Sequence, residues 1–177
     1  MFDEVVRILE ARPTLRIFAN LSGASLNDAD LLAYIEGRLR TCNVPPGRLA
    51  FEITESAAVA DLASARNWIR RLKELGCRFA LDDFGVGFSS LGYLRALAVD
   101  YVKIDRTFIR DVDTNPTNRA LVQAVKSVAH TLGKEVIAEG VETAAHAAVL
   151  LELGIEHGQG FHWGKAEPEI PELLAIN

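Results

Sequence analysis

Residues 78–94, RFALDDFGVGFSSLGYL, carry the pattern from which the architecture follows. The segment 79–81 is apolar and is typical of a buried strand, and Asp82 and Asp83 come directly after it. Two carboxylates in such a place repel each other, and burial disfavours their charged form unless a cation lies beside them. A divalent metal that prefers oxygen ligands, such as Mg²⁺ or Mn²⁺, is a common solution. A solvated turn capped by Asp83 is the plainer alternative.

The rest of the chain alternates short apolar segments with segments of helical periodicity. The apolar segments predict six strands, at 15–21, 49–55, 79–82, 101–105, 135–139 and 158–163. Apolar residues at helical spacing predict helices at 2–11, 31–39, 62–72, 121–132 and 143–153. Regular alternation of this kind indicates an α/β protein with a parallel sheet built from βα units.

Polar side chains lie within or at the end of every predicted strand. They are Asn20, Glu52, Asp82, Asp83, Lys103, Asp105, Glu139 and Gln159. In a (β/α) barrel the carboxyl ends of the strands converge on one mouth, where the chemistry is built. In an open doubly wound sheet they are spread along a line, and no glycine-rich dinucleotide fingerprint follows the first strand here. The polar strand ends therefore favour a TIM-like (β/α) barrel.

The alternation of side chains along the strands supports a shared site. Lys103 and Asp105 fall on one face of their predicted strand, and Val102 and Ile104 fall on the other. Charged groups at interior positions are costly unless they are paired or bind a metal. A simple buried salt bridge of Lys103 with Asp105, and a solvent-facing edge strand for Glu52, are the alternatives. Explanations of this kind would have to be repeated for each of the strands, so a single site shared by all of these polar residues is favoured.

The composition limits the class of protein. The chain has 177 residues, 49% of them hydrophobic and 24% charged, and we expect a single domain over 1–177. The net charge of −5 argues against binding a nucleic acid polymer. No apolar run reaches the roughly 18 residues of a membrane span, and no signal peptide is visible, so we expect no membrane contact. Cys42 and Cys77 fit neither a zinc site nor a disulfide framework, which favours a cytoplasmic location.

Six segments together resemble the EAL domain family of cyclic di-GMP phosphodiesterases. They are NLS at 20–22, FEITES at 51–56, DDFGVGFSSLGYL at 82–94, VDYVKIDRTFI at 99–109, VIAEGVET at 136–143 and HGQGF at 157–161. They stand in the family's order and cover nearly the whole chain. The resemblance implies a modified TIM barrel that binds two Mg²⁺ or Mn²⁺ ions. It also implies hydrolysis of one phosphodiester bond of cyclic di-GMP to give linear pGpG.

The resemblance implies a metal-binding role for four residues. Asn20, Glu52 and Asp82 would ligate one metal, and Asp82 and Asp83 would hold the second, with Asp82 bridging. Paired metals clamp the attacking and leaving oxygens of a displacement and lower the pKa of bound water. They would also allow an acidic pocket to accept a dianionic substrate.

The resemblance also implies catalytic roles. Lys103 would orient and help to activate the attacking water, and Glu139 would join the network of metals and water. Glu55 would anchor the DDFG loop that holds the second metal. The residues implied to surround these groups or to contact water are Asp105, Glu142 and Gln159.

The sequence departs from the family at one important point. The signature Glu-Ala-Leu segment is absent, and in the family its Glu is a metal ligand. A whole TIM barrel has eight strands and about 250 residues, whereas about six strands are predicted here. We therefore expect the C-terminal three-quarters of an EAL domain, an incomplete barrel with a weakened two-metal site. Open sheet edges would favour a homodimer or another form of self-association.

Three functional hypotheses follow. The first is a metal-dependent cyclic di-GMP phosphodiesterase acting in bacterial second-messenger signalling. The second is a catalytically impaired module that binds cyclic di-GMP or a protein partner, and the third is another metal-assisted TIM-barrel enzyme. Trp68 is expected to pack in the core. Core packing is also favoured for Trp163, and contact with a guanine is its alternative. Residues 91–97 are expected either to be buried or to form a dimer contact.

Overall fold

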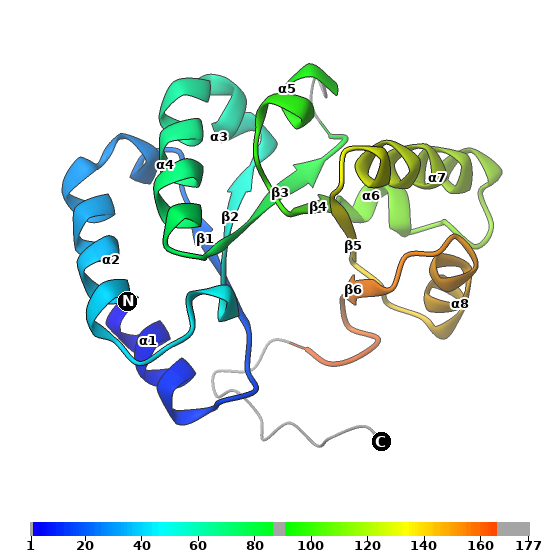
Figure 1. Cartoon of the computed structure of the whole chain (residues 1–177). Coiled ribbons are helices and arrows are strands. Elements are labelled where there is room, and N and C mark those ends of the chain that lie inside the picture. The colour runs from blue at the N-terminus through cyan, green and yellow to red at the C-terminus, as the bar shows by residue number, and fades with distance from the viewer. Residues whose placement is uncertain (1, 87–90, 166–177) are drawn as a thin grey trace.

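The computed structural model describes residues 2–86 and 91–165, so part of the 78–94 stretch lies outside the described residues. Its centre is a sheet of six parallel strands whose spatial order follows the chain order (Figure 1). The strands are β1 (Ile17–Leu21), β2 (Leu49–Thr54), β3 (Arg78–Phe84), β4 (Tyr101–Ile104), β5 (Glu135–Glu139) and β6 (His157–Gln159). They form half of a (β/α) barrel, with β1 and β6 at its edges. The predicted α/β architecture with six strands is confirmed.

Helices connect the strands on one side of the sheet. They are α1 (Phe2–Ala11), α2 (Ala29–Thr41), α3 (Glu55–Ala60), α4 (Leu62–Glu74), α5 (Leu91–Ala96), α6 (Arg106–Ile109), α7 (Pro116–Thr131) and α8 (Ala144–Glu152). Two short 3₁₀ helices precede α2 and β2, at Ser25–Asn27 and Pro46–Arg48. Among the described helices, none combines the length and apolarity needed to cross a membrane.

The hydrophobic core lies between these helices and one face of the sheet. Phe51 in β2 and Phe79 in β3 pack with ring centroids 5.5 Å apart, and Ile53 and Leu81 extend the same buried face. Trp68 of α4 is also buried, and its indole N–H donates to the carbonyl oxygen of Leu26 at 3.0 Å. The predicted packing of Trp68 is confirmed. The opposite face of the sheet carries only a small apolar cluster and is left for polar groups.

Side-chain caps begin several of the helices directly after a strand or loop. Thr143 accepts a hydrogen bond from the backbone N–H of His146, as the sequence predicted. Asp105 was expected to end the fourth strand, but that strand ends at Ile104. Asp105 instead caps α6 by accepting from the N–H of Thr107 at 2.8 Å. The predicted strand 101–105 is therefore one residue too long. The simple salt bridge of Lys103 with Asp105 is not formed, since Lys103 pairs with Glu52, Asp82 and Glu139.

A bulge places the two adjacent aspartates. Leu81 pairs with Val102 and Phe84 pairs with Ile104, so β3 contains one residue more than β4 over this interval. The extra residue puts Asp83 at a positive φ of 55°, outside the ordinary strand conformation. A bulge re-aims the side chains beside it. As a result Asp82 is buried and Asp83 is exposed, although they are neighbours in the sequence.

Candidate active site

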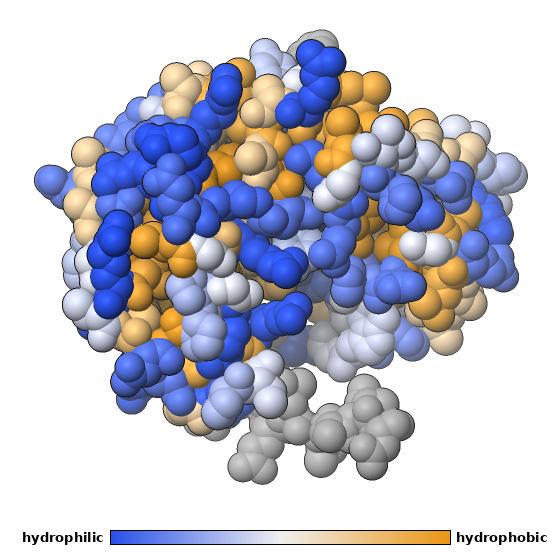
Figure 2. All heavy atoms as spheres, in the orientation of Figure 1, coloured by the Kyte–Doolittle hydropathy of each residue, from blue (hydrophilic) through white to orange (hydrophobic). Residues whose placement is uncertain are grey.

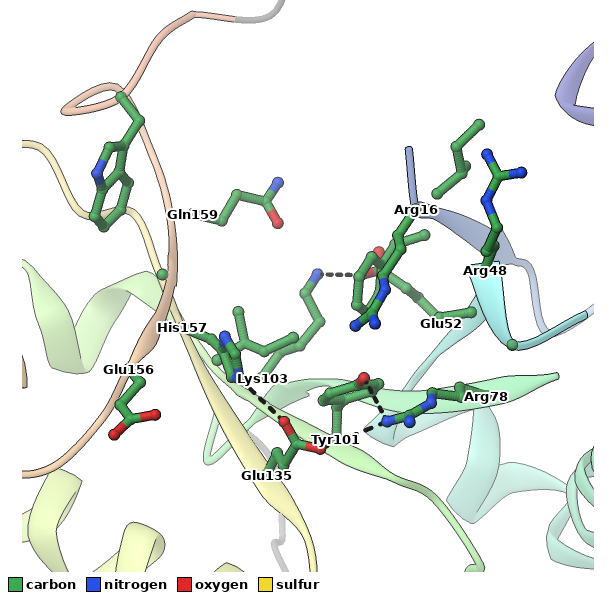
Figure 3. A pocket seen from close by; sticks show the side chains of 17 residues that line it. Arg16, Arg48, Glu52, Arg78, Tyr101, Lys103, Glu135, Glu156, His157 and Gln159 are labelled. Atoms are coloured by element: carbon green, nitrogen blue, oxygen red, sulfur yellow. Dashed lines mark hydrogen bonds and ion pairs between the residues drawn. The ribbon is translucent and has the colours of Figure 1, made fainter. Parts of the chain in front are cut away.

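Lys103 is the centre of a cluster of buried carboxylates. Its ammonium lies 2.8 Å from Oε1 of Glu52, 3.0 Å from Oδ1 of Asp82 and 2.6 Å from Oε1 of Glu139. About 3% of the Lys103 side chain is exposed. The three carboxylates come from β2, β3 and β5, around the central position of β4 (Figure 3 shows the Lys103–Glu52 contact). We call Lys103, Glu52, Asp82 and Glu139 the lysine–carboxylate cluster.

The register of the sheet explains why these residues meet. In a parallel sheet, residues in register share a face, and residues two apart in one strand share it as well. Asn20 is in register with Glu52, and Thr54, two residues further along, is in register with Asp82. On the other side, Lys103 is in register with Ile137, which lies two residues before Glu139. The predicted polar strand ends therefore share one face of the sheet.

The charges of the cluster are unbalanced, since three carboxylates surround one ammonium. Burial raises the pKa of Glu52 and of Glu139, and the hydrogen bonds from Lys103 offset part of this effect. Burial by itself would lower the pKa of Lys103, but its hydrogen bonds to Glu139 and Glu52 outweigh burial, and the pKa lies above its ordinary value. Burial and the neighbouring Asp82 raise the pKa of Asp83. A further cation at this site would relieve the excess negative charge.

Three carboxylates are close enough to bind one metal ion together. Oxygens of Asp82, Asp83 and Glu139 all lie within 4.8 Å of one another. Carboxylate oxygens are the ligands that Mg²⁺ and Mn²⁺ prefer, so this donor set fits a hard divalent cation. The sequence had assigned the ligands to Asn20, Glu52, Asp82 and Asp83 and had placed Glu139 in the network of metals and water. The structure groups Glu139 directly with Asp82 and Asp83.

Glu55 connects the start of α3 to the turn after Asp83. Its side chain is buried, and its Oε2 accepts a hydrogen bond from the backbone N–H of Gly85 at 3.3 Å. The backbone N–H of Asp83 itself donates to Oδ1 of Asp82 at 3.0 Å. The turn that presents Asp83 is thus held from two directions.

The remaining predicted site residues lie around the cluster. Asp105, the cap of α6, is close enough to Asp83 to act on its charge. Gln159 is exposed on β6, in register with Glu139. Glu142 is exposed just beyond β5. Asn20 is exposed on the edge strand β1. Each of these residues lies at or near the carboxyl end of the sheet.

A groove of about 710 Å³ runs from the lysine–carboxylate cluster along the polar face of the sheet. Figure 2 shows hydrophilic side chains gathered around a hollow in the middle of the molecule. The sequence analysis missed the residues toward the amino ends of the strands, where Arg16, Arg48 and Arg78 line the groove with Phe18 and Tyr101 (Figure 3). The signal that could have found them is the period of two, since Phe18 precedes Asn20 by two positions and Tyr101 precedes Lys103 likewise.

The aromatic and basic side chains of the groove contact one another. Arg78 donates to the hydroxyl oxygen of Tyr101 at 2.8 Å, and its guanidinium also lies over the Tyr101 ring. Phe18 meets the same ring edge to face with centroids 5.5 Å apart. Figure 3 also shows His157 bound to Glu135, with nitrogen and oxygen 3.0 Å apart. Arg78 also lies 3.5 Å from a carboxylate oxygen of Glu135, and Glu52 and Glu156 line the groove as well. The groove therefore combines aromatic surface with charges of both signs.

One prediction about an apolar side chain needs correction. Trp163 was expected in the core, but it is 55% exposed and lines the groove. Its ring lies against Gly158, where an added methyl group would come within 2.6 Å of it. In the segment 91–97, Leu94 and Leu97 are buried, whereas Leu91 is 57% exposed. The expected burial is thus confirmed for Leu94 and Leu97, and the dimer contact stays a prediction.

Comparison with known proteins agrees with this geometry. Residues 1–166 match the model of the EAL domain. Cyclic di-GMP phosphodiesterase PdeB of Shewanella oneidensis is 40% identical over 152 residues, which are 86% of this chain and 18% of that protein. The chain spans about a fifth of the length of the curated relatives that it matches.

Solved structures show the same fold. The structure of the PaMucR phosphodiesterase in complex with c-di-GMP has a TM-score of 0.82 and 33% identity, over 92% of this chain and 66% of that one. The EAL domain of Mycobacterium smegmatis DcpA has a TM-score of 0.81 and 34% identity, over 90% and 72% of the two chains. Six strands in register, polar residues at their carboxyl ends and a family match over nearly the whole chain lead to one conclusion: the chain belongs to the EAL domain family.

Proposed function

We propose that the chain binds cyclic di-GMP at the carboxyl end of its sheet and hydrolyses one phosphodiester bond to give linear pGpG. The observation that carries this proposal is the set of oxygens from Asp82, Asp83 and Glu139 within 4.8 Å of one another beside Lys103. Relatives named as cyclic di-GMP phosphodiesterases, and a related structure solved as a c-di-GMP complex, support the choice of substrate.

The proposal includes two divalent cations, Mg²⁺ or Mn²⁺. Asp82 and Asp83 would hold both of them, and Asn20, Glu52 and Glu139 would supply further oxygens. Such ions would lower the pKa of a bound water and neutralise charge on the phosphate. The buried, unbalanced carboxylates favour this arrangement, because they carry more negative charge than Lys103 can compensate.

Lys103 acts in this scheme as a donor of hydrogen bonds. Three carboxylate oxygens within 3.0 Å of its nitrogen favour the ammonium form of the side chain. An ammonium has three N–H donors, and Glu52, Asp82 and Glu139 lie within reach of them. Lys103 thereby fixes the carboxylates and would direct one donor to the attacking water when a carboxylate turns to a metal.

Glu55 is a positioning residue in this proposal. It holds the N–H of Gly85 and with it the turn that presents Asp83. Asp105, Glu142 and Gln159 lie around the cluster and would contact water or substrate.

A second candidate is a module that binds cyclic di-GMP or a protein partner without cleavage. It is kept because Lys103 forms ion pairs with Glu52, Asp82 and Glu139, and these carboxylates would have to turn to a metal for catalysis. We also propose that the chain associates with itself. Within the described residues β1 and β6 each pair with one neighbour, so each leaves an open strand edge.

Product analysis separates the two candidates. The purified chain is incubated with cyclic di-GMP and Mg²⁺ or Mn²⁺, with an EDTA control, and the products are separated by chromatography. Linear pGpG that appears only with metal supports the enzyme. Binding without product identifies a module that binds cyclic di-GMP. A chain that neither binds nor cleaves cyclic di-GMP contradicts the enzyme and leaves only a module for a protein partner.

A further inference from the structure

A second, smaller cavity lies beside the mouth of the site and contains unpaired positive charge. It has a volume of about 260 Å³ and lies between α6 and the residues after β5. Arg106, Thr107, Arg110, Gly140 and Glu142 line it, and none of them lines the groove described above. Within residues 2–86 and 91–165, neither guanidinium makes a side-chain hydrogen bond or an ion pair. The lining of this cavity therefore includes two arginines and one glutamate.

Backbone packing places this cavity next to the lysine–carboxylate cluster. Gly140 directly follows Glu139, whose carboxylate is bound to Lys103. Gly140 has a φ of +68°, and a methyl group on it would lie 2.5 Å from Cβ of Arg106. The start of α6 thus rests on the backbone beside Glu139, and the guanidinium of Arg106 is close enough to Asp83 to act on its charge.

The two arginines are positioned to act as a pair. Arg106 is the first residue of α6, and Arg110 follows that helix with helical backbone angles of −46° and −42°. Residues four apart in a helix lie on the same side of it. Guanidinium groups match phosphate oxygens in geometry and form strong, charge-assisted hydrogen bonds with them. Two arginines beside the lysine–carboxylate cluster are therefore suited to bind an anionic group that the carboxylates would repel.

We propose that Arg106 and Arg110 bind the phosphate of cyclic di-GMP that is not being cleaved, which rests on the proposed function above. Cyclic di-GMP carries two phosphodiester groups, and the carboxylate cluster with its cations would take only the reacting one. The other phosphate needs positive charge beside the mouth, and this cavity provides it. The pair would then set the orientation of the ring without touching the reacting atoms.

The test compares charge-removing variants with a matched control. R106Q and R110Q keep much of the side-chain stem, so the contact of Arg106 with Gly140 remains. R95Q removes an exposed arginine from α5, outside this cavity. The dissociation constant of cyclic di-GMP is measured by titration calorimetry with Ca²⁺, and kcat and KM are measured with Mg²⁺.

We expect the R106Q/R110Q double variant to bind cyclic di-GMP about tenfold more weakly or worse, with KM raised in parallel and kcat changed little. Its affinity should also depend less on salt concentration than that of the wild type, which a merely structural role would not produce. R95Q should match the wild type. R110Q alone should lose part of the affinity for cyclic di-GMP. This single variant tests the inference if the double variant does not fold.

Two results would overturn the inference, and they differ in meaning. If the wild type binds cyclic di-GMP and the arginine variants bind it equally well, the arginine subsite is wrong while the proposed function stands. If the wild type and R95Q do not bind cyclic di-GMP with any metal, the proposed function fails and the subsite fails with it.

Discussion

At the scale of single residues, Lys103 decides the electrostatics of the site. It is almost fully buried, and each of the three carboxylates around it lies within hydrogen-bond distance. A buried ion pair is costly to break, because removal of one partner leaves the other charge without compensation. In this protein the loss of one lysine would leave three such carboxylates.

Replacement of Lys103 should therefore destabilise the metal-free protein. K103M is expected to lower the free energy of unfolding by roughly 3–5 kcal/mol in EDTA, the range for an unpaired buried charge. Mn²⁺ should restore more stability to K103M than it adds to the wild type, because the ion would replace the lost positive charge. Urea unfolding with and without Mn²⁺ measures both effects. K165M, at an exposed position, is the control, and equal stability of K103M and the wild type in EDTA would refute the expectation.

The two cysteines should differ in reactivity. Burial raises the pKa of the Cys77 thiol to about 12, so at pH 8 the group is protonated and also inaccessible. Cys42 is half-buried. Alkylation of the folded chain with iodoacetamide at pH 8, followed by peptide mass spectrometry, should label Cys42 and spare Cys77. Both should react after denaturation. Rapid labelling of Cys77 in the folded chain would show that this part of the core opens.

At the scale of secondary-structure elements, the bulge in β3 separates the roles of two adjacent aspartates. It leaves Asp82 buried within the lysine–carboxylate cluster and Asp83 exposed beside that cluster. Gly85 follows in a conformation with φ of +106°, and Glu55 holds its N–H. The short turn thus depends on a residue without a side chain and on one buried hydrogen bond.

A methyl group at Gly85 should disturb this turn. In G85A the new atom would meet the Phe108 ring at 2.7 Å, in addition to the strain of a positive φ. Gly133 also has a positive φ, but nothing lies within 4 Å of its added methyl group. We expect G133A to cost about 1–2 kcal/mol of stability, the backbone strain alone, and G85A to cost more. G85A should also reduce kcat, because Asp83 moves with the turn. Equal losses of stability in urea unfolding would contradict the role given to Phe108.

At the scale of the whole molecule, the chain has one covered and one open face. Helices and the core cover one face of the half-barrel, while the other face carries the groove, with carboxylates at the carboxyl ends of the strands and arginines at the amino ends. Phe18, at the edge strand β1, is 38% exposed on the open face. An open edge beside exposed aromatic surface is a typical site of association between chains.

Self-association is expected at micromolar concentration. Sedimentation should show species larger than the 19.4 kDa monomer, with the proportion rising with protein concentration. F18K should shift the equilibrium toward the monomer, because it places a charge on the edge strand. L121K changes an exposed leucine on α7 and should leave association unchanged. A monomer at every concentration for the wild type would contradict this proposal.

The fold was largely predictable because its signals are periodic. The alternation of strands and helices, the helix at 2–11 and the cap at Thr143 follow from local patterns, and the structure confirms them. The short helices α3 and α6 span less than two turns, and so leave too little periodicity to detect. The exposure of Trp163 depends on its packing against Gly158, which comes from tertiary structure.

The residues of the candidate site could be predicted from the sequence, but the contacts between their side chains could not. Charged residues inside apolar strands are conspicuous, so Glu52, Lys103 and Glu139 could be found from the sequence. Their distances depend on strand register and on the bulge at Asp82 and Asp83, and no local pattern encodes either. The arginines of the groove were missed because cationic residues near strand starts are ordinary on a protein surface.

The measurement that tests the central claim most directly is the rate of cyclic di-GMP hydrolysis by the wild type and by D82N. The account predicts that the wild type forms linear pGpG in Mg²⁺ or Mn²⁺ and that D82N loses at least about a hundredfold in kcat, since Asp82 would contact both metals and Lys103. D30N, at an exposed position on α2, should keep the wild-type rate. Hydrolysis by D82N at the wild-type rate would contradict the assignment of the lysine–carboxylate cluster as the active site.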